Sequence, residues 1–238
     1  MTEVVILAGG KGTRLKSVVY DRPKPMAEIN GVPFLCHLMD YWVGQGTKHF
    51  ILSVGFMKEF VIQYFGNDYK GVPITYVEEE KPLGTGGALI KSIKTVSDQN
   101  FVLTNGDTLM AINFAEMLKE HNRFSADLTM SVLKQISHKK HGTVEIGKNG
   151  EVTRFEEKPK GASARWVNGG TYIVNKDLIG NRWCKGKNIS FETEMMTAFI
   201  KQNRRIYAYQ SESEFIDIGD PDDFLRSGSV VKRINHLV

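Results

Sequence analysis

The sequence has few cysteines and no long apolar run. Only Cys36 and Cys184 occur among the 238 residues, far apart and without neighbouring histidines. This usage excludes a disulfide framework and indicates no zinc site, so we expect both to be packing residues. The apolar runs are too short to span a bilayer, and Glu3 stands where a signal peptide would carry basic residues. We therefore expect a cytoplasmic protein that does not enter a membrane.

The sequence also lacks a dense basic stripe. Its 31 Lys and Arg residues are scattered among 27 Asp and Glu residues, and the net charge is +4. A nucleic-acid-binding protein would show clustered basic residues, whereas a small positive charge is compatible with an anionic substrate. With 41% apolar and 24% charged residues, the composition is that of a globular protein. The length predicts one domain over residues 1–238 and leaves the oligomeric state open.

Strand and helix signals alternate along the first hundred residues. Strands are predicted at Val4–Ala8, Phe50–Val54, Ile74–Val77 and Phe101–Thr104. Helices are predicted at Pro33–Gly46, Met57–Phe65 and Gly86–Val96, the second with Phe60, Val61, Tyr64 and Phe65 at helical spacing. Parallel strands joined by helical crossovers need cover on both faces, so this series predicts an α/β fold with a parallel sheet. Ligands are expected at the carboxyl ends of its strands.

The second half of the chain breaks this rhythm. Predicted strands Thr143–Ile146 and Val152–Phe155 flank Asn149-Gly150, a strong hairpin signal. We expect the hairpin to form part of a lid over the substrate. A helix is predicted at Phe191–Gln202, and another begins at Asp220-Pro221, with Asp220 as its cap.

A glycine-rich stretch follows the first predicted strand and reads Leu7-Ala8-Gly9-Gly10-Lys11-Gly12-Thr13-Arg14-Leu15. Glycines allow backbone amides to approach a polyphosphate, and Arg14 can neutralise its charge. The stretch has neither the spacing of a P-loop nor that of the dinucleotide fingerprint, so kinase and dehydrogenase functions lose support. It predicts a phosphate-binding loop of another kind.

A lysine between two prolines comes next, in Pro23-Lys24-Pro25-Met26. The prolines restrict the backbone and so fix where the ammonium group can point. Together with Gly-Gly-x-Gly-Thr-Arg-Leu, this tetrapeptide resembles the sugar-1-phosphate nucleotidylyltransferases. The resemblance covers nearly the whole chain, through Pro82–Ala88, Asn105-Gly106-Asp107, Glu156–Pro159, Asn168-Gly169-Gly170 and Phe215–Gly219 in family order.

The resemblance implies a fold and a division of the chain. The fold is a Rossmann-like, mostly parallel mixed sheet flanked by helices, with the β-hairpin as a sugar-binding lid. The nucleotide-binding part would span about 1–110, the sugar-phosphate-binding part about 111–220, and a C-terminal helix about 221–236. The nucleotide-binding residues would be Leu7, Ala8, Gly9, Gly10, Gly12, Thr13, Arg14, Glu79, Gly84, Thr85 and Asp107.

The same resemblance assigns the catalytic, metal and sugar residues. Asp107 and Asp217 would bind Mg²⁺, and carboxylate oxygens are the ligands that this ion prefers. Arg14, Lys24 and Lys158 would stabilise charge on the phosphates. The residues at the sugar phosphate would be Gly142, Glu157, Lys158, Asn168, Thr171 and Tyr172. The basic run over 138–141 is interpreted as a mobile loop without a catalytic role.

Glu79 predicts which nucleotide base is preferred, because it stands at the position where related enzymes place the residue that recognises the base. A carboxylate only accepts hydrogen bonds, and guanine presents two adjacent donors, which favours GTP. The Ser17–Ala27 and Asn30–Leu35 stretches look like those of D-glycero-α-D-manno-heptose 1-phosphate guanylyltransferases. Cytidylyl-, uridylyl- and thymidylyltransferases stay as alternatives, as do a catalytically silent regulatory subunit and a dinucleotide-dependent oxidoreductase.

Overall fold

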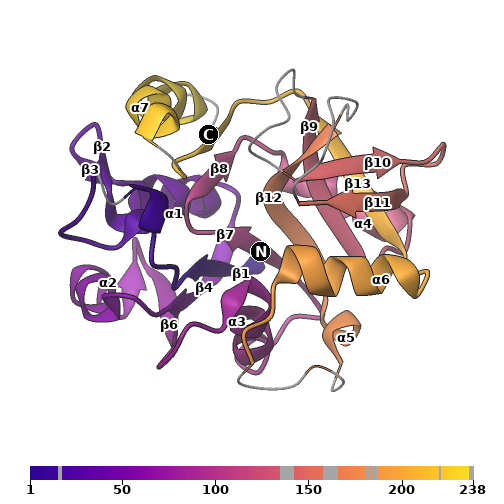
Figure 1. The fold of residues 1–238 in the computed structure, drawn as a ribbon, viewed down its shortest axis with the longest axis horizontal. Coiled ribbons are helices and arrows are strands. Elements are labelled where there is room, and N and C mark those ends of the chain that lie inside the picture. Colours follow the sequence, from indigo (N-terminus) through magenta and orange to yellow (C-terminus); the bar gives the residue numbers. More distant parts are fainter. Residues whose placement is uncertain are drawn as a thin grey trace.

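The computed structural model describes residues 1–15, 18–134, 142–157, 166–180, 183, 187–219 and 221–235. Figure 1 shows strands and helices in layers. The strands are β1 (Thr2–Ala8), β2 (Glu28–Ile29), β3 (Val32–Pro33), β4 (Thr47–Val54), β5 (Asp68–Tyr69), β6 (Val72–Glu78), β7 (Asn100–Asn105), β8 (Thr108–Met110), β9 (Leu128–Lys134), β10 (Thr143–Ile146), β11 (Val152–Glu156), β12 (Trp166–Asn175), β13 (Ile206–Ser211) and β14 (Phe215–Asp217). The α-helices are α1 (Phe34–Gly44), α2 (Lys58–Phe65), α3 (Gly84–Ser92), α4 (Phe114–Arg123), α5 (Lys176–Ile179), α6 (Thr197–Lys201) and α7 (Pro221–Asn235).

Ten of the strands form one mixed sheet in the order β11-β10-β12-β7-β1-β4-β6-β5, with β9 paired to β12 and β13 paired to β9. Strands β7, β1, β4 and β6 run parallel to one another in the middle of this sheet. This confirms the predicted parallel sheet. Successive residues of β1 face opposite sides, since Val4 and Ile6 belong to one apolar cluster and Val5 to the other, and all three are fully buried. Burial on both faces explains why this strand is apolar throughout.

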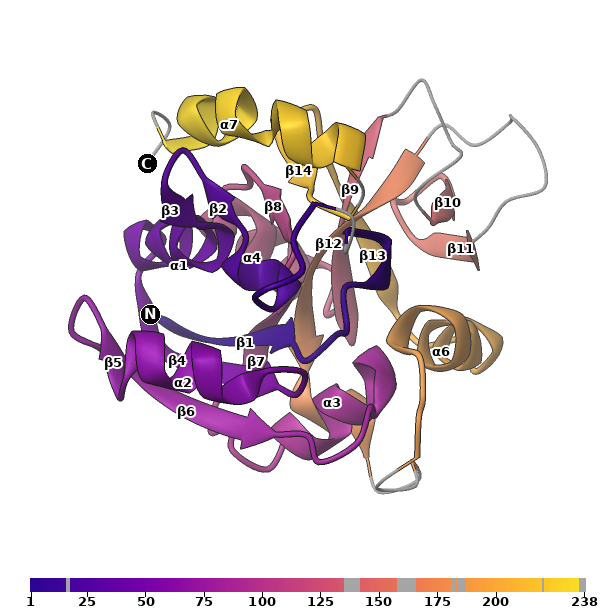
Figure 2. The same ribbon diagram turned by 60° about the vertical axis from the view of Figure 1, so that its left-hand side comes forward.

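Helices cover both faces of the sheet. Helices α1, α2, α4 and α7 contribute to the apolar cluster around Val4, and α3, α5 and α6 to the cluster around Val5. In Figure 2, α1 and α7 lie on one side of β1 and α3 on the other. The predicted Rossmann-like mixed sheet flanked by helices is therefore confirmed. In the part of the chain that the structure describes, no helix has the length and apolarity needed to cross a membrane.

The second half of the chain extends the same sheet with antiparallel pairs. Strand β12 runs antiparallel to β7, with Thr171 opposite Thr104, and also antiparallel to β9 and β10. Strands β10 and β11 form the predicted hairpin, and Gly150 in its turn has φ +87°. A left-handed φ favours glycine. The function of the hairpin as a lid stays a prediction.

Three sequence expectations need correction or adjustment. Phe60 and Tyr64 are 37% and 53% exposed, because α2 buries Val61 and Phe65 against the sheet and packs Ile62 partly against it. The segment expected to be a helix over Phe191–Gln202 begins as a π-helix, η3 (Phe191–Met196), before α6. Helix α3 spans Gly84–Ser92 and not Gly86–Val96. Helix α7 begins at Pro221, as expected, but its predicted cap Asp220 lies outside the described residues, as does Cys184.

Candidate active site

A cavity of about 930 Å³ opens at the carboxyl ends of β1, β6 and β7, the sheet edge where ligands were expected. Its wall includes residues from both halves of the chain. From the predicted nucleotide, catalytic and metal sets it contains Leu7, Ala8, Gly9, Gly10, Gly12, Thr13, Arg14, Lys24, Glu79, Gly84, Thr85, Asp107 and Asp217. From the predicted sugar set it contains Gly142, Glu157 and Asn168.

The glycine-rich loop after β1 is packed closely against its neighbours. A Cβ on Gly9 would collide with the Glu79 carboxylate, and a Cβ on Gly12 would lie 2.8 Å from Cβ of Lys24. Gly12 also has φ +57°, in the left-handed region. These glycines therefore allow the loop to run beside Glu79 and Lys24, which brings the predicted phosphate loop and base-reading residue to one wall.

Lys24 lies between two carboxylates. It begins the 3₁₀ helix η2 (Lys24–Met26), and Pro23 before it has φ −67° and ψ 147°. Its Nζ is 2.6 Å from Oδ2 of Asp107 and 3.8 Å from Oδ1 of Asp217, and its side chain is only 9% exposed. The sequence predicted that Lys24 meets a phosphate, whereas in the structure its charge is balanced by the two aspartates.

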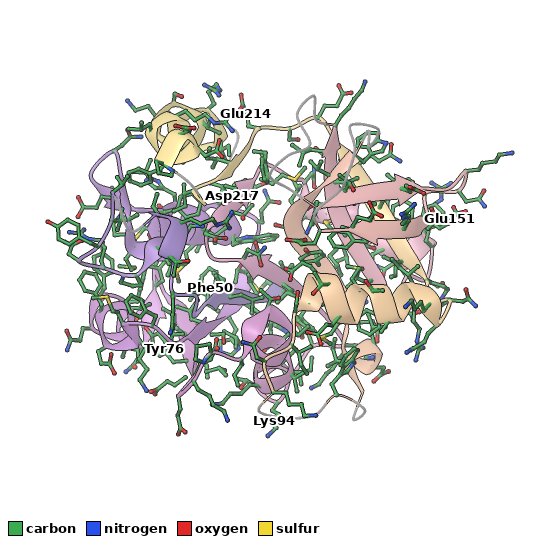
Figure 3. All side chains as sticks on the ribbon, in the orientation of Figure 1. Phe50, Tyr76, Lys94, Glu151, Glu214 and Asp217 are labelled. Carbon is green, nitrogen blue, oxygen red and sulfur yellow. The ribbon has the colours of Figure 1, made fainter. Side chains whose placement is uncertain are left out.

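Asp107 and Asp217 are brought together by a small two-stranded sheet. Strand β14 pairs antiparallel with β8, which sets Asp217 opposite Thr108, and the Ile218 N–H donates to the Asp107 carbonyl at 3.0 Å. In Figure 3, Asp217 lies toward the middle of the molecule, while Glu214 lies nearer its rim. Two residues more than a hundred positions apart in sequence thus face one cavity.

The two carboxylates differ in their affinity for protons. Burial raises the pKa of Asp107, but the charge and hydrogen bond of Lys24 outweigh it, and the net pKa is below its usual value. Burial and the nearby Asp107 charge raise the pKa of Asp217 to about 6. Both shifts arise because two like charges share a poorly solvated space with one ammonium group.

The two aspartates suit a magnesium ion whose remaining ligands come from the substrate and from water. Among the described residues, no group of three or more His, Cys, Asp or Glu side chains forms a metal cluster. Mg²⁺ is commonly held by one or two carboxylates, with substrate phosphates and waters as the other ligands. Asp107 and Asp217 supply oxygen ligands beside the predicted phosphate loop, so the donor set suits that ion.

Glu79 follows β6 and is 9% exposed at the cavity wall. Its Oε1 accepts a hydrogen bond from Ser53 Oγ at 3.1 Å, and its Oε2 accepts one from the Leu83 N–H at 3.0 Å. Each carboxylate oxygen has a second acceptor site. The side chain is therefore held in one orientation, and each of its oxygens can still accept one further hydrogen bond.

The predicted sugar residues fall into two groups. Asn168 lines the cavity, and its backbone N–H donates to the Gly142 carbonyl at 2.8 Å. Thr171 and Tyr172 do not line it: they are 3% and 0% exposed, on a strand that is paired with β7 on one side and with β9 on the other. Tyr172 accepts a hydrogen bond from Asn168 Nδ2 at 2.6 Å, so it supports a wall residue. Lys158 and the basic run over 138–141 lie outside the described residues.

Several wall residues were not predicted from the sequence. Asn105 and Phe215 stand inside motifs that carried the resemblance, so a signal for them was present. Asn188 precedes the π-helix η3, and Glu192 lies in its first turn. The sequence predicted only a helix for this segment. Their place at the cavity depends on the fold, and nothing in their local sequence marks it.

Comparison with known proteins gives a family match over almost the full chain. A family model described as nucleotidyl transferase matches residues 3–232. A D-glycero-alpha-D-manno-heptose 1-phosphate guanylyltransferase from Aneurinibacillus thermoaerophilus is 39% identical, covering 99% of this chain and 100% of the relative. One from Campylobacter jejuni is 36% identical, covering 93% of this chain and 96% of the relative. The crystal structure of HddC from Yersinia pseudotuberculosis complexed with GMP-PN has a TM-score of 0.84 at 33% identity, covering 96% of this chain and 99% of that one.

Proposed function

The chain belongs to the nucleotidyl transferase family, and from this premise we propose that it transfers GMP from GTP to D-glycero-α-D-manno-heptose 1-phosphate. The products would be a GDP-activated sugar and pyrophosphate. One observation carries the proposal: a single cavity joins the glycine-rich loop, Lys24, two aspartates and the polar residues Glu157 and Asn168. Such a wall suits two phosphorylated substrates that must meet.

The reaction needs positioning and charge stabilisation more than a general base. An oxygen of the sugar phosphate attacks the α-phosphorus of the nucleotide, a new P–O bond forms, the bond to the pyrophosphate oxygen breaks, and pyrophosphate leaves. The attacking phosphate has a second pKa of about 6 and is already largely dianionic at neutral pH. Arg14 at the loop and Lys24 beside Asp107 provide cations for the phosphates. The catalytic role predicted for Lys158 is part of this proposal.

Asp107 and Asp217 are the residues that would hold Mg²⁺. When bound, the ion supplies positive charge to the phosphate oxygens and helps to align them. Lys24 would then exchange its contact with Asp107 for a substrate phosphate, since its ammonium group is the cation nearest to both carboxylates among the described contacts. Magnesium as the cofactor and these two residues as its ligands remain part of the proposal.

Glu79 supports guanine as the base. The guanine N1–H and N2–H are adjacent donors, and one carboxylate can receive both. The two guanylyltransferase relatives and the neighbour with GMP-PN support the same base. The sugar substrate rests on the relatives alone, because sugar stereochemistry is read by loop residues whose pattern does not identify it.

The other functions considered from the sequence have less support. A dinucleotide-dependent oxidoreductase is excluded by the family match. Arg14, Lys24, Asp107 and Asp217 all lie at one cavity. A regulatory subunit without catalytic activity would not require these four charged residues together. The division into a nucleotide part (about 1–110) and a sugar part (about 111–220) within one domain is also proposed. So is a cytoplasmic location, where nucleoside triphosphates are available.

The test is release of pyrophosphate with Mg²⁺ from GTP, CTP, UTP and dTTP, each with heptose, mannose, glucose and N-acetylmuramate 1-phosphates. Reactions without sugar and with EDTA are the controls. GTP with the heptose phosphate is expected to be the strongest pair and to need the metal. Another productive pair would retain the reaction class and overturn the substrates. No release with any pair, together with measurable GTP binding by calorimetry, would favour the regulatory subunit.

A further inference from the structure

The described cavity wall carries both cations and carboxylates. The cations are Lys11, Arg14 and Lys24, all from the N-terminal segment, and Lys24 lies between Asp107 and Asp217. The second half of the chain also contributes Glu157 and Glu192 to the wall. Cations suit phosphates, whereas carboxylates accept hydrogen bonds from hydroxyl groups. Glu192 therefore suits a hydroxyl group of a substrate better than a phosphate.

Glu192 is buried and oriented by two hydroxyl groups. It is 9% exposed, at the start of the π-helix η3. Its Oε2 accepts hydrogen bonds from Thr85 Oγ1 at 2.6 Å and Ser190 Oγ at 3.2 Å. Thr85 Oγ1 in turn accepts one from the Phe191 N–H at 2.8 Å. No hydrogen bond is found to Oε1 within the described part of the chain, so this oxygen keeps acceptor capacity, and Glu192 is a residue of the cavity wall.

The surroundings of Glu192 place it near the predicted sugar residues. Burial, followed by the charge of Glu192, raises the pKa of Tyr172, and Glu157 adds to the effect. Tyr172 is the residue that accepts the hydrogen bond from Asn168. The carboxylates of Glu157 and Glu192 thus both raise the pKa of the Tyr172 phenol, which is hydrogen-bonded to the wall residue Asn168.

The segment that carries Glu192 is fixed against the nucleotide side. The N–H groups of Gly86 and Gly87 donate to the Ile189 carbonyl at 2.8 and 3.2 Å, and the Ile189 N–H donates to the Leu83 carbonyl at 2.8 Å. Figures 1 and 2 both show the chain that enters α6 beside α3. The position of Glu192 is therefore set by backbone bonds, and it does not depend on a flexible loop.

We propose that Glu192 is a further substrate-binding residue, whose Oε1 accepts a hydrogen bond from a ring hydroxyl of the sugar 1-phosphate while Thr85 holds Oε2. This inference rests on the proposed function, because it assigns one more contact in the same cavity. A carboxylate repels a phosphate and accepts a hydrogen bond from a hydroxyl group, so a hydroxyl is the partner that it suits.

The test compares Glu192→Gln with wild type on the sugar 1-phosphate that wild type uses best. The amide keeps the volume and an acceptor for Thr85 but loses the charge. The KM for the sugar phosphate is expected to rise at least about tenfold, as for loss of a charge-assisted hydrogen bond. The Kd of GTP alone, measured by calorimetry, is expected to stay within about twofold of wild type. Glu194→Gln is the matched control: Glu194 is exposed on the same π-helix, and the amide oxygen keeps an acceptor for the Ser190 N–H, so both constants should stay unchanged.

Monodeoxy analogues separate binding from a structural role. Wild type should discriminate against one analogue by at least about tenfold, because a site built to bind a hydroxyl is left unpaired without it. Glu192→Gln should lose that discrimination and keep the discrimination against the other analogues. Equal discrimination in both proteins, or a loss of GTP affinity as large as the loss for the sugar, would overturn the inference. Turnover by wild type in the same assay shows separately whether the proposed function holds.

Discussion

At the scale of single residues, the site depends on like charges held close together. Asp107 and Asp217 share the Lys24 ammonium group in a poorly solvated space, and the pKa of Asp217 is raised to about 6 as a result of burial and of the Asp107 charge. Such an arrangement costs stability and is kept where function needs it. Lys24 is the link between this carboxylate pair and the glycine-rich loop, through its contact with Gly12.

Asp107→Asn is expected to abolish turnover and leave the fold intact. The change removes a negative charge and almost no volume, so kcat should fall by more than about 100-fold. Circular dichroism in the far and near ultraviolet should match wild type. Asp68→Asn, at an exposed position, should retain full activity. Retained activity in Asp107→Asn would remove Asp107 from the catalytic set.

Glu79→Gln is expected to weaken the preference for GTP. An amide offers one acceptor and one donor group where guanine needs two acceptors, so kcat/KM for GTP should fall by about 10- to 100-fold. The values for CTP and UTP should change little. The measurement is kcat/KM for the three nucleotides with one sugar phosphate. An unchanged order of preference would mean that Glu79 serves only to hold Ser53 and Leu83.

At the scale of elements, the glycines in the first turn of α3 are required by packing as well as being suited to a ligand. A Cβ on Gly84 would lie 2.5 Å from the Ile189 carbonyl oxygen, and Gly84 has φ +70°. A Cβ on Gly87 would lie 2.7 Å from the Lys187 carbonyl oxygen. The Gly-Thr-Gly-Gly sequence therefore allows two halves of the chain to approach each other at the cavity.

Gly84→Ala is expected to lower the free energy of unfolding by about 1–3 kcal/mol, because it combines a strained φ with a backbone clash. Urea denaturation measures the change. Gly71→Ala provides a comparison, since Gly71 also has positive φ (+80°) but a Cβ there meets nothing within 4 Å. If the two variants were equally stable, the approach of Ile189 would contribute nothing and the strain of φ alone would explain the loss.

The sequence predicted elements well where periodicity and boundary signals agreed. The strands β1, β4, β6 and β7 and the hairpin of β10 and β11 were anticipated within a few residues. The short pair β8 and β14 was not, because neither strand is long enough to show a period. The burial of Thr171 and Tyr172 also escaped prediction, since it follows from the pairing of β12 with β7 and β9, which the sequence alone does not show. Most predicted residues inside the motifs lie at the cavity wall, whereas the wall residues Asn105, Asn188 and Glu192 were not predicted.

At the scale of the whole molecule, the two ends of the parallel strands have different functions. The carboxyl edge carries the cavity, while the amino edge carries a buried carboxylate, Glu3, with 2% exposure. Glu3 Oε2 accepts hydrogen bonds from the N–H groups of Ser97 and Asp98, both at 2.7 Å, and Oε1 accepts one from Ser97 Oγ at 2.9 Å. His49 Nδ1 lies 3.1 Å from Oε1. This network joins β1, β4 and the turn before β7.

Glu3→Gln is expected to destabilise the protein by about 1–3 kcal/mol at pH 7, because an amide donor would face buried N–H groups. Burial raises the pKa of Glu3, but its hydrogen bonds outweigh this and hold the pKa below 4.5. The stabilisation is therefore complete above pH 4.5 and is lost as the pH falls through the lowered pKa. Urea denaturation from pH 7 to pH 3 should show the difference between variant and wild type shrink in acid. The KM values for both substrates should not change, and a change would contradict the separation of the two edges.

The pairing of β7 with β12 has a consequence for how such an enzyme diversifies. Asp107 follows β7 and Asn168 lies on β12, and the two strands are fixed to each other by the pairing of Thr104 with Thr171. The spacing between the predicted nucleotide-binding and sugar-binding residues is therefore fixed by the backbone once the sheet has formed. Loops around the cavity could change in sequence, as a change of base or sugar would require, without altering this spacing.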